Sequence, residues 1–310
     1  MVPAERRSIW HGVLVAVTTP FAPDGSVDHP ASVRHARWLV ERGVDALVVG
    51  GSLGEGASLT AEERASLVTD LVPELPSTIP VIAAVAAAET LDVVRQARRA
   101  ASDGARGLLV LPPYVYHGDR RETNAHFAAV FRATELPCML YNNPPAYVTD
   151  VGPEQVLELA EEHPTLVAVK ESSGDVRRIT SLRALLGDRI EVAVGLDEAI
   201  LGGIRAGAVG WVAGLANALP EESVALFALG SRGDPATELY HRFLPLLRMD
   251  TGPKFVQKIK LVGAELGQGS PRVRPPRLEL AGTEREEVLA TLRTYLEHRP
   301  TVSPRLRPAD

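Results

Sequence analysis

Lys170 is the residue whose type and position best fit covalent chemistry. It directly follows the apolar run LeuValAlaVal (166–169), so its side chain should begin in the wall of a buried strand. Burial lowers the pKa of a lysine, and the resulting neutral amine can attack carbonyl and imine carbons. The alternative is a lysine that has left the buried run and forms a salt bridge with Glu171 or Asp175. The position therefore predicts either a Schiff-base nucleophile or a structural ion pair.

Tyr141 ends another apolar run, CysMetLeuTyr (138–141), at the equivalent place. A phenol there could pass protons to and from a group attached to Lys170. The alternative is a core tyrosine with a satisfied hydroxyl, which is the commoner role of a lone tyrosine. Because neighbouring parallel strands bring such side chains to one edge of a barrel, the pair predicts a pocket better than either residue alone.

A glycine-rich segment, GlyGlySerLeuGlyGlu (50–55), follows a third apolar run. Its backbone N–H groups are free of bulky side chains and suit a carboxylate, and the Ser52 hydroxyl adds a donor. The same glycines could instead serve only a tight turn. The eight histidines are scattered, so no cluster has metal-ligand spacing, and no GlyXXXXGlyLysSer/Thr phosphate loop occurs. The pattern fits either a carboxylate site or a tight turn, and it gives no sign of a metal site.

Eight apolar runs, each followed by a loop and a helix-like stretch, would position these residues. Continuous runs rich in valine and leucine are typical of parallel strands buried on both faces. ThrAlaGluGlu (60–63) is a capping box, and segments 153–156 and 175–179 also carry helix-starting residues. Eight alternations predict an α/β fold, a closed (β/α)8 TIM barrel with its chemistry at the C-terminal strand ends. The runs cover 13–17, 46–50, 81–85, 107–111, 138–141, 166–170, 191–195 and 210–213.

The chain continues past the eighth run further than one closing helix requires. We predict a catalytic barrel over 1–220, a C-terminal helical appendage over 221–300, and a flexible, proline-rich tail over 301–310. The helices predicted beyond the eighth run cover 221–232, 235–248, 254–266 and 283–297.

Charge and composition restrict the possible partners and the compartment. The formal net charge of −6 argues against a nucleic-acid partner, and we interpret the basic run ArgValArgProProArg (272–277) as a solvated loop. Cys138 is the only cysteine, so we expect a reducing compartment and a buried, inert thiol. The stretch 13–17 is too short for an export signal, and no run approaches the ~18 apolar residues of a membrane span. We expect a cytoplasmic protein with no membrane partner.

Four segments together resemble the dihydrodipicolinate synthase / N-acetylneuraminate lyase superfamily of class I aldolases. The resemblance extends from about residue 10 to residue 297, with the motifs in family order and each at a predicted strand end. It implies the barrel fold and an enzyme. The segments are GlyGlySerLeuGlyGlu (50–55), TyrAsnAsnPro (141–144), ValLysGluSerSerGlyAsp (169–175) and GlyAlaValGlyTrpValAlaGlyLeuAlaAsn (207–217).

By this resemblance, the chain acts on a small 2-oxo acid or a cyclic imine. Lys170 would form the Schiff base, and Tyr141 would donate and accept the proton. Ser52 would hold the substrate carboxylate and relay protons. The resemblance also implies no metal, no organic cofactor and a homotetramer arranged as a dimer of dimers. The remaining substrate-binding positions would be Gly51, Leu53, Gly195 and Val212.

Two positions depart from the pattern of the synthases in this superfamily. Synthases carry an arginine shortly after the tyrosine motif to bind the carboxylate of aspartate semialdehyde, and Ala146 stands in that place. A small apolar residue cannot replace a bidentate carboxylate clamp. Synthases and many lyases also place a tyrosine that reaches across a dimer where this chain has Val115, with Tyr116 one position further on. Both departures argue against the synthase of the lysine pathway.

Three further segments resemble a narrower group, the 1-pyrroline-4-hydroxy-2-carboxylate deaminases of hydroxyproline breakdown. This activity is our main prediction. Lys170 would attack the ring imine carbon and open the ring, and Tyr141 would help the 4-hydroxyl to leave as water. Hydrolysis would then release ammonia and 2,5-dioxopentanoate. The segments cover 141–151, 255–261 and 274–278.

Alternative activities stay open. A 4-hydroxy-tetrahydrodipicolinate synthase would join pyruvate to aspartate semialdehyde, and a 2-oxo-3-deoxy sugar acid aldolase or dehydratase would use the same Schiff base. GlyLeuAspGlu (195–198) resembles a sugar-hydroxyl-binding stretch of the sialic acid lyases, although we favour Asp197 and Glu198 as helix caps. A non-catalytic barrel that binds pyruvate as a regulator would gain no covalent label on Lys170 from pyruvate and borohydride.

Overall fold

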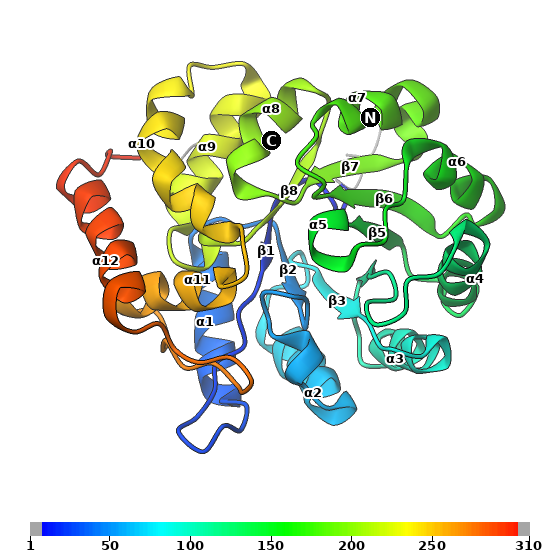
Figure 1. The fold of residues 1–310 in the computed structure, drawn as a ribbon, viewed down its shortest axis with the longest axis horizontal. Helices are drawn as coiled ribbons and strands as arrows, with labels where there is room; N and C mark the ends of the chain where they lie inside the picture. Colours follow the sequence, from blue (N-terminus) through cyan, green and yellow to red (C-terminus); the bar gives the residue numbers. More distant parts are fainter. Residues whose placement is uncertain (1–7, 303–310) are drawn as a thin grey trace.

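The fold is a closed barrel of eight parallel strands surrounded by helices (Figure 1). A computed structural model describes residues 8–302 of the chain. Neighbouring strands pair in sequence order, and β8 pairs back with β1 to close the barrel. The (β/α)8 prediction is confirmed, and each predicted apolar run matches a strand to within one residue at either end. The strands are β1 (Gly12–Ala16), β2 (Ala46–Val49), β3 (Val81–Val85), β4 (Gly107–Val110), β5 (Cys138–Asn142), β6 (Leu166–Glu171), β7 (Glu191–Val194) and β8 (Gly210–Ala213).

Both faces of the barrel wall are apolar, which explains why the strands are continuous apolar runs. Side chains alternate between the two faces of a strand. One set, which includes Leu14, Ile82 and Met139, packs together inside the barrel, and the other set packs against the helices. Lys170 follows Ala168 of the inner set by two residues, so the alternation directs its side chain into the barrel.

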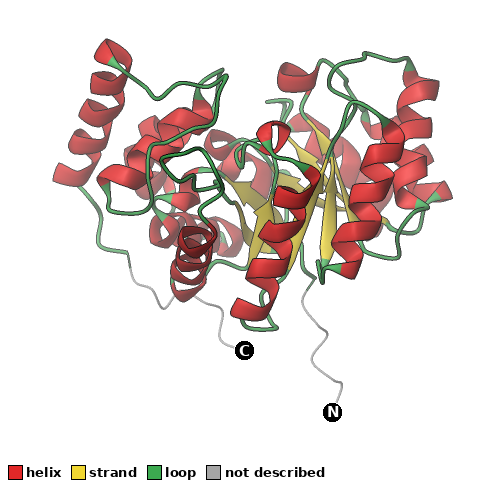
Figure 2. Ribbon diagram, turned by 90° about the horizontal axis from the view of Figure 1, so that it is seen from below, coloured by secondary structure: helices red, strands yellow, loops and turns green. Residues whose placement is uncertain are grey.

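The helices lie around the strands of the barrel (Figure 2). The predicted capping box is confirmed, because the Thr60 hydroxyl accepts from the Glu63 N–H at 3.2 Å and Glu63 accepts from the Thr60 N–H at 2.9 Å. Apart from the one-turn helix α5, which α6 follows before β6, each helix between two strands leads the chain back to the start of the next strand. The helices up to β8 are α1 (His29–Glu41), α2 (Ala61–Leu71), α3 (Thr90–Ser102), α4 (Arg120–Phe131), α5 (Pro144–Tyr147), α6 (Pro153–Glu162), α7 (Arg177–Leu186) and α8 (Ile200–Arg205).

Four long helices follow β8, close to the predicted ranges. α9 packs against β1 and α8, so it occupies the place of the eighth barrel helix, whereas α10, α11 and α12 gather at one side of the barrel (Figure 1). A helical C-terminal segment is therefore present. The exact division at residue 220 stays a prediction, and positions 303–310 of the predicted tail lie outside the described residues. These helices are α9 (Pro220–Arg232), α10 (Thr237–Leu247), α11 (Phe255–Glu265) and α12 (Gly282–Glu297).

Candidate active site

One cavity of about 630 Å³ opens at the C-terminal ends of the strands. Its wall combines strand ends, the glycine-rich loop after β2, the short helix α5 and the segment that joins α10 to α11. The cavity brings together every catalytic or substrate-binding residue that the sequence predicts. These residues are Gly51, Ser52, Leu53, Tyr141, Lys170, Gly195 and Val212.

Lys170 and Tyr141 are direct partners on β6 and β5. The Lys170 side chain is 7% exposed, and its Nζ lies 4.1 Å from the centroid of the Tyr141 ring. The alternative of a salt bridge with Glu171 or Asp175 does not hold. Glu171 accepts from the Asn142 side chain and the Ser173 N–H, and Asp175 pairs with Arg177. Lys170 is therefore a buried amine that faces the cavity without a direct carboxylate partner among the described residues.

Gly195, at the end of β7, leaves room for the Lys170 side chain. A Cβ at this position would lie 2.6 Å from the Lys170 Cε and 1.9 Å from the Ser172 Oγ. Any larger residue would displace the lysine stem or the serine hydroxyl. The role of Gly195 in the structure is thus to make space for the amine.

Tyr147 is a site residue that the sequence analysis missed. Its hydroxyl forms a hydrogen bond with the Ser52 hydroxyl, and its ring meets the Tyr141 ring edge-on with 5.7 Å between centroids. Burial, and then the neighbouring Tyr141, raise the pKa of Tyr147 well above its usual value. The Tyr141 hydroxyl instead accepts from the Asn143 Nδ2 at 2.9 Å. The cavity of Lys170 therefore contains two hydrogen-bonded groups that can hold a proton. One is the Tyr141 hydroxyl, and the other is the Ser52–Tyr147 pair.

The helix that brings Tyr147 to the cavity has a local sequence signal. Asn143 caps α5 by accepting from the Ala146 N–H at 3.2 Å, and Pro144 occupies the first helical position. Asparagine followed by proline is a typical helix start. A search for such caps would have placed Tyr147 one turn after Asn143, on the side of the strand ends.

Asp197 is not the helix cap that we predicted. Its side chain is fully buried and accepts three hydrogen bonds, from the Trp211 Nε1 at 2.9 Å, the Gly214 N–H at 3.0 Å and the Leu215 N–H at 2.7 Å. Asp197 therefore ties the end of β7 to the end of β8. Burial raises the pKa of Asp197 to about 6, although the three donors oppose the rise. Glu198 lies apart from the cavity lining and accepts from the Arg248 Nε at 3.0 Å.

Asp250 is a second cavity residue without any signal in the sequence. It belongs to the turn between α10 and α11 and lies against Gly214, where a Cβ would be 2.3 Å from the Asp250 Oδ1. Burial, and next the charge of Asp197, raise the pKa of Asp250 well above its ordinary value, while Lys170 lowers it. Asp250 in the cavity wall and Asp197 buried behind it are thus two acidic side chains within electrostatic range of the amine.

The two departures from the synthase pattern lie where the cavity meets solvent. Ala146 contributes an exposed side chain to the cavity rim. Val115 and Tyr116 are 68% and 60% exposed, and the Tyr116 hydroxyl donates to Glu122 at 3.1 Å, so Tyr116 does not reach the cavity of its own chain. Tyr114 lines the cavity instead.

The basic run 272–277 is not the solvated loop that we predicted. Arg274 forms an ion pair with Glu63 at 2.7 Å, and Arg277 lines the cavity. The run was misjudged because its acidic partners come from a distant part of the sequence. Cys138 is buried as expected, and burial raises the pKa of its thiol to about 12.

Two searches of residues 8–302 concern metals and membranes. No group of three or more histidine, cysteine, aspartate or glutamate side chains is arranged to hold a metal ion. No helix within the same range is both long and apolar enough to cross a bilayer. The expected absence of a cofactor and the cytoplasmic location stay predictions.

Comparison with known proteins gives concordant results. The model of the Dihydrodipicolinate synthetase family matches residues 10–295. A 4-hydroxy-tetrahydrodipicolinate synthase from Salinibacter ruber is 36% identical over 273 residues, which cover 86% of this chain and 89% of the relative. The crystal structure of dihydrodipicolinate synthase from Aquifex aeolicus superposes with a TM-score of 0.89 at 28% identity and covers 93% of this chain and 98% of that one. A pyruvate complex of dihydrodipicolinate synthase from Acinetobacter baumannii has a TM-score of 0.86 at 28% identity, with 93% and 99% covered.

Proposed function

Because the chain belongs to the dihydrodipicolinate synthetase family, whose members are class I Schiff-base lyases, we propose that Lys170 binds a 2-oxo acid covalently. The observation that carries this proposal is the placement of the amine. Lys170 is buried at the bottom of a cavity, beside the Tyr141 ring, and neither Glu171 nor Asp175 pairs with it. Such an amine is available as a nucleophile once it has lost its proton.

The reaction proceeds through an enamine. The Lys170 Nζ attacks C2 of pyruvate, the carbinolamine loses water, and the resulting Schiff base loses a proton from C3 to give a carbon nucleophile. Tyr141 lies close enough to Lys170 to carry protons in these steps. Tyr147 and Ser52 form a second hydrogen-bonded pair on the same wall, where the pyruvate carboxylate meets the glycine-rich loop.

The second reactant is an aldehyde, and 4-hydroxy-tetrahydrodipicolinate synthase is the activity with the best support. Relatives with that name match most of the chain, and the Salinibacter ruber protein is 36% identical. The absence of an arginine at Ala146 argued against this activity on sequence. Arg64 and Arg277 line the same cavity, however, so its wall is cationic without that arginine. This arrangement supports the condensation of pyruvate with aspartate semialdehyde.

The deaminase of hydroxyproline breakdown is the second candidate. Ala146 and the exposed Val115 favour it, because a small cyclic substrate with one carboxylate needs neither the missing arginine nor the missing tyrosine. None of the relatives described above has that name. A sugar-acid aldolase has less support, since Asp197 is fully buried, already accepts from three N–H donors and does not line the cavity where a sugar hydroxyl would lie.

Trapping with pyruvate and sodium borohydride tests the proposal. We expect the wild-type chain to gain the mass of one reduced pyruvate adduct on Lys170 and the Lys170→Ala variant to fold but gain none. Lys254→Ala is the matched control, because this lysine is exposed and pairs with Glu284. Labelling that persists in Lys170→Ala would refute the assignment.

A pair of assays separates the two candidate functions. One measures condensation of pyruvate with aspartate semialdehyde, and the other measures ammonia released from 1-pyrroline-4-hydroxy-2-carboxylate. Condensation without ammonia release is the expected result. Ammonia release without condensation would instead establish the deaminase.

A further inference from the structure

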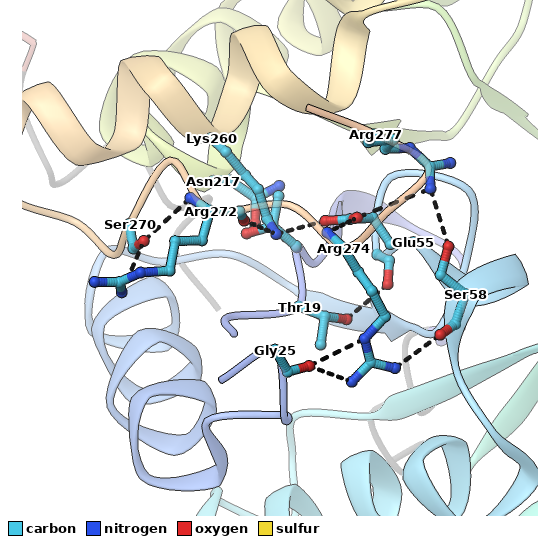
Figure 3. A network of polar contacts seen from close by, with 12 residues as sticks. Thr19, Gly25, Glu55, Ser58, Asn217, Lys260, Ser270, Arg272, Arg274 and Arg277 are labelled. Carbon is cyan, nitrogen blue, oxygen red and sulfur yellow. Dashed lines mark hydrogen bonds and ion pairs between the residues drawn. The ribbon is translucent and has the colours of Figure 1, made fainter. Parts of the chain in front are cut away.

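Arg277 lies in a cluster of charges in which positive side chains outnumber negative ones (Figure 3). Glu55 is fully buried at the centre of this cluster. Its Oε1 accepts from the Lys260 ammonium at 2.5 Å, and its Oε2 accepts from the Arg274 N–H at 2.9 Å. The Arg277 Nη1 is 3.8 Å from the Glu55 Oε2, beyond hydrogen-bond distance. Because Glu55 already neutralises Lys260, little of the negative charge of Glu55 remains to pair with Arg277.

Arg274, three residues earlier, has a structural role. Its guanidinium pairs with Glu63 through two contacts of 2.7 Å. Its remaining donors bond the carbonyls of Gly25 and Ser58 (Figure 3). A guanidinium that is fully used in this way holds the segment against the barrel and cannot bind a substrate as well.

Arg277 differs from Arg274 in each respect. Its side chain is 27% exposed and lines the same cavity as Lys170 and Tyr147. The only hydrogen bond of this side chain within residues 8–302 runs from Nη1 to the Ser58 Oγ at 3.2 Å. Burial raises the pKa of Tyr147, and the positive charge of Arg277 opposes this rise. The guanidinium is therefore within electrostatic range of the Ser52–Tyr147 pair.

Arg64 is the other arginine in the cavity wall, and both of its terminal nitrogens already donate to backbone carbonyls. Its Nη1 donates to the Gly50 carbonyl at 3.1 Å, and its Nη2 donates to the Gly56 carbonyl. These bonds hold the glycine-rich loop in place. Arg277 is therefore the cavity arginine whose fork remains open for a planar, bidentate anion such as a carboxylate.

We infer that Arg277 binds the carboxylate of the second reactant, an aldehyde acid that the enamine on Lys170 attacks. The inference rests on the proposed function and names the group that selects its aldehyde. Arg277, which comes from the C-terminal segment, thus takes the role of the arginine that is missing at Ala146. Arg277 acts as a specificity-determining residue and takes no part in forming the Schiff base.

Kinetics of an Arg277→Met variant with two aldehydes test this inference. Succinate semialdehyde carries a carboxylate, and butanal has the same chain length without one. We expect kcat/KM for succinate semialdehyde to fall roughly 10- to 100-fold, the effect of losing a charge-assisted hydrogen-bonded pair. The value for butanal and the borohydride trapping of pyruvate should change by less than about twofold, since neither involves this carboxylate.

Two further variants complete the design. Arg272→Met is the matched control, because Arg272 is an exposed arginine on the same segment and, among the residues that the structure describes, its side chain bonds only Ser270. Its kinetics should equal those of the wild type. Arg277→Lys should fold like the wild type and recover part of the lost preference, since a lysine supplies the charge without the fork.

The inference is overturned if Arg277→Met lowers kcat/KM for neither aldehyde or for both equally. It is also overturned if the wild-type chain traps pyruvate but does not prefer succinate semialdehyde to butanal. In that case the Schiff-base proposal survives. Failure of the wild-type chain to trap pyruvate would overturn both.

Discussion

At the scale of single residues, two buried carboxyls, Asp197 and Asp250, lie within electrostatic range of Lys170. Asp197 and Asp250 both have raised pKa values, chiefly because they are buried, and Lys170 is the positive charge that opposes the rise in each. Two neighbouring carboxyls titrate as a pair rather than as separate groups. The pair therefore keeps a proton at pH values where an isolated aspartate has lost it. This proton lies within electrostatic range of the Lys170 amine.

This pair should make stability depend on pH. A carboxyl whose pKa is higher in the folded than in the unfolded state stabilises the fold below its unfolded pKa, and this stabilisation is lost as the pH rises through the folded value. For Asp197 the window extends from 3.8 to about 6. The free energy of unfolding should therefore contain a contribution that falls over this window. Replacing Asp250 by asparagine removes one of the two groups and should make that fall smaller.

Urea unfolding of Asp250→Asn at about pH 4 and about pH 7 measures this effect against the wild type. Asp188→Asn serves as the control, because the Asp188 side chain is 97% exposed and should leave the pH dependence unchanged. The same pH dependence in Asp250→Asn and in the wild type would show that the pair does not hold a proton in the folded state.

At the scale of single elements, local hydrogen bonds determine where the helices begin. The capping box of Thr60 starts α2 directly after the glycine-rich loop, and the Asn143 cap starts α5 beside the cavity. Because α2 also carries Arg64, which bonds the carbonyls of Gly50 and Gly56, the start of this helix helps to hold one wall of the site.

Thr60→Ala should destabilise the fold by about 1 kcal/mol, because the Glu63 N–H loses its acceptor. Thr69→Ala on the same helix is the matched control. Its exposed hydroxyl donates only to the Ser66 carbonyl, so the free energy of unfolding should change by less than about 0.5 kcal/mol. Chemical denaturation measures both values, and equal effects of the two changes would contradict the assigned cap.

At the scale of the whole molecule, a buried ion pair joins the barrel to its C-terminal helices. Glu55 is the last residue of the glycine-rich loop, and Lys260 belongs to α11 and has a side chain that is 3% exposed (Figure 3). Lys260 also donates to the Arg272 carbonyl at 2.7 Å. The C-terminal segment that carries Arg277 is thereby attached to the loop that carries Ser52. The predicted homotetramer would add contacts between subunits, and it stays a prediction.

Breaking this pair should cost much more than an exposed salt bridge. Glu55→Gln leaves the buried Lys260 ammonium without a counter-charge and should lower the free energy of unfolding by about 3–5 kcal/mol. Lys260→Met leaves Glu55 with Arg277 at 3.8 Å and should cost less. The double variant should cost clearly less than the sum, because it leaves no unpaired charge. Urea unfolding of all four chains forms the double-mutant cycle, and strictly additive effects would rule out the coupling.

The sequence by itself determined the barrel and the places of the proposed reactive side chains in it. The eight apolar runs are local patterns, and closure of a parallel barrel then places every strand end at one face. Lys170, Tyr141 and Gly195 were predictable for this reason, because each stands at a fixed position relative to the end of its own strand.

Only the tertiary structure decided which loop and appendage residues complete the cavity. Asp250 and Arg277 reach the cavity because segments far apart in the sequence pack together, and such contacts leave no periodic pattern in the sequence. Asp197 and the run 272–277 were misjudged on the same account, since their partners lie at Trp211 and Glu63. Strand position follows from local geometry, whereas the path of a loop follows from contacts that exist only after the barrel has closed.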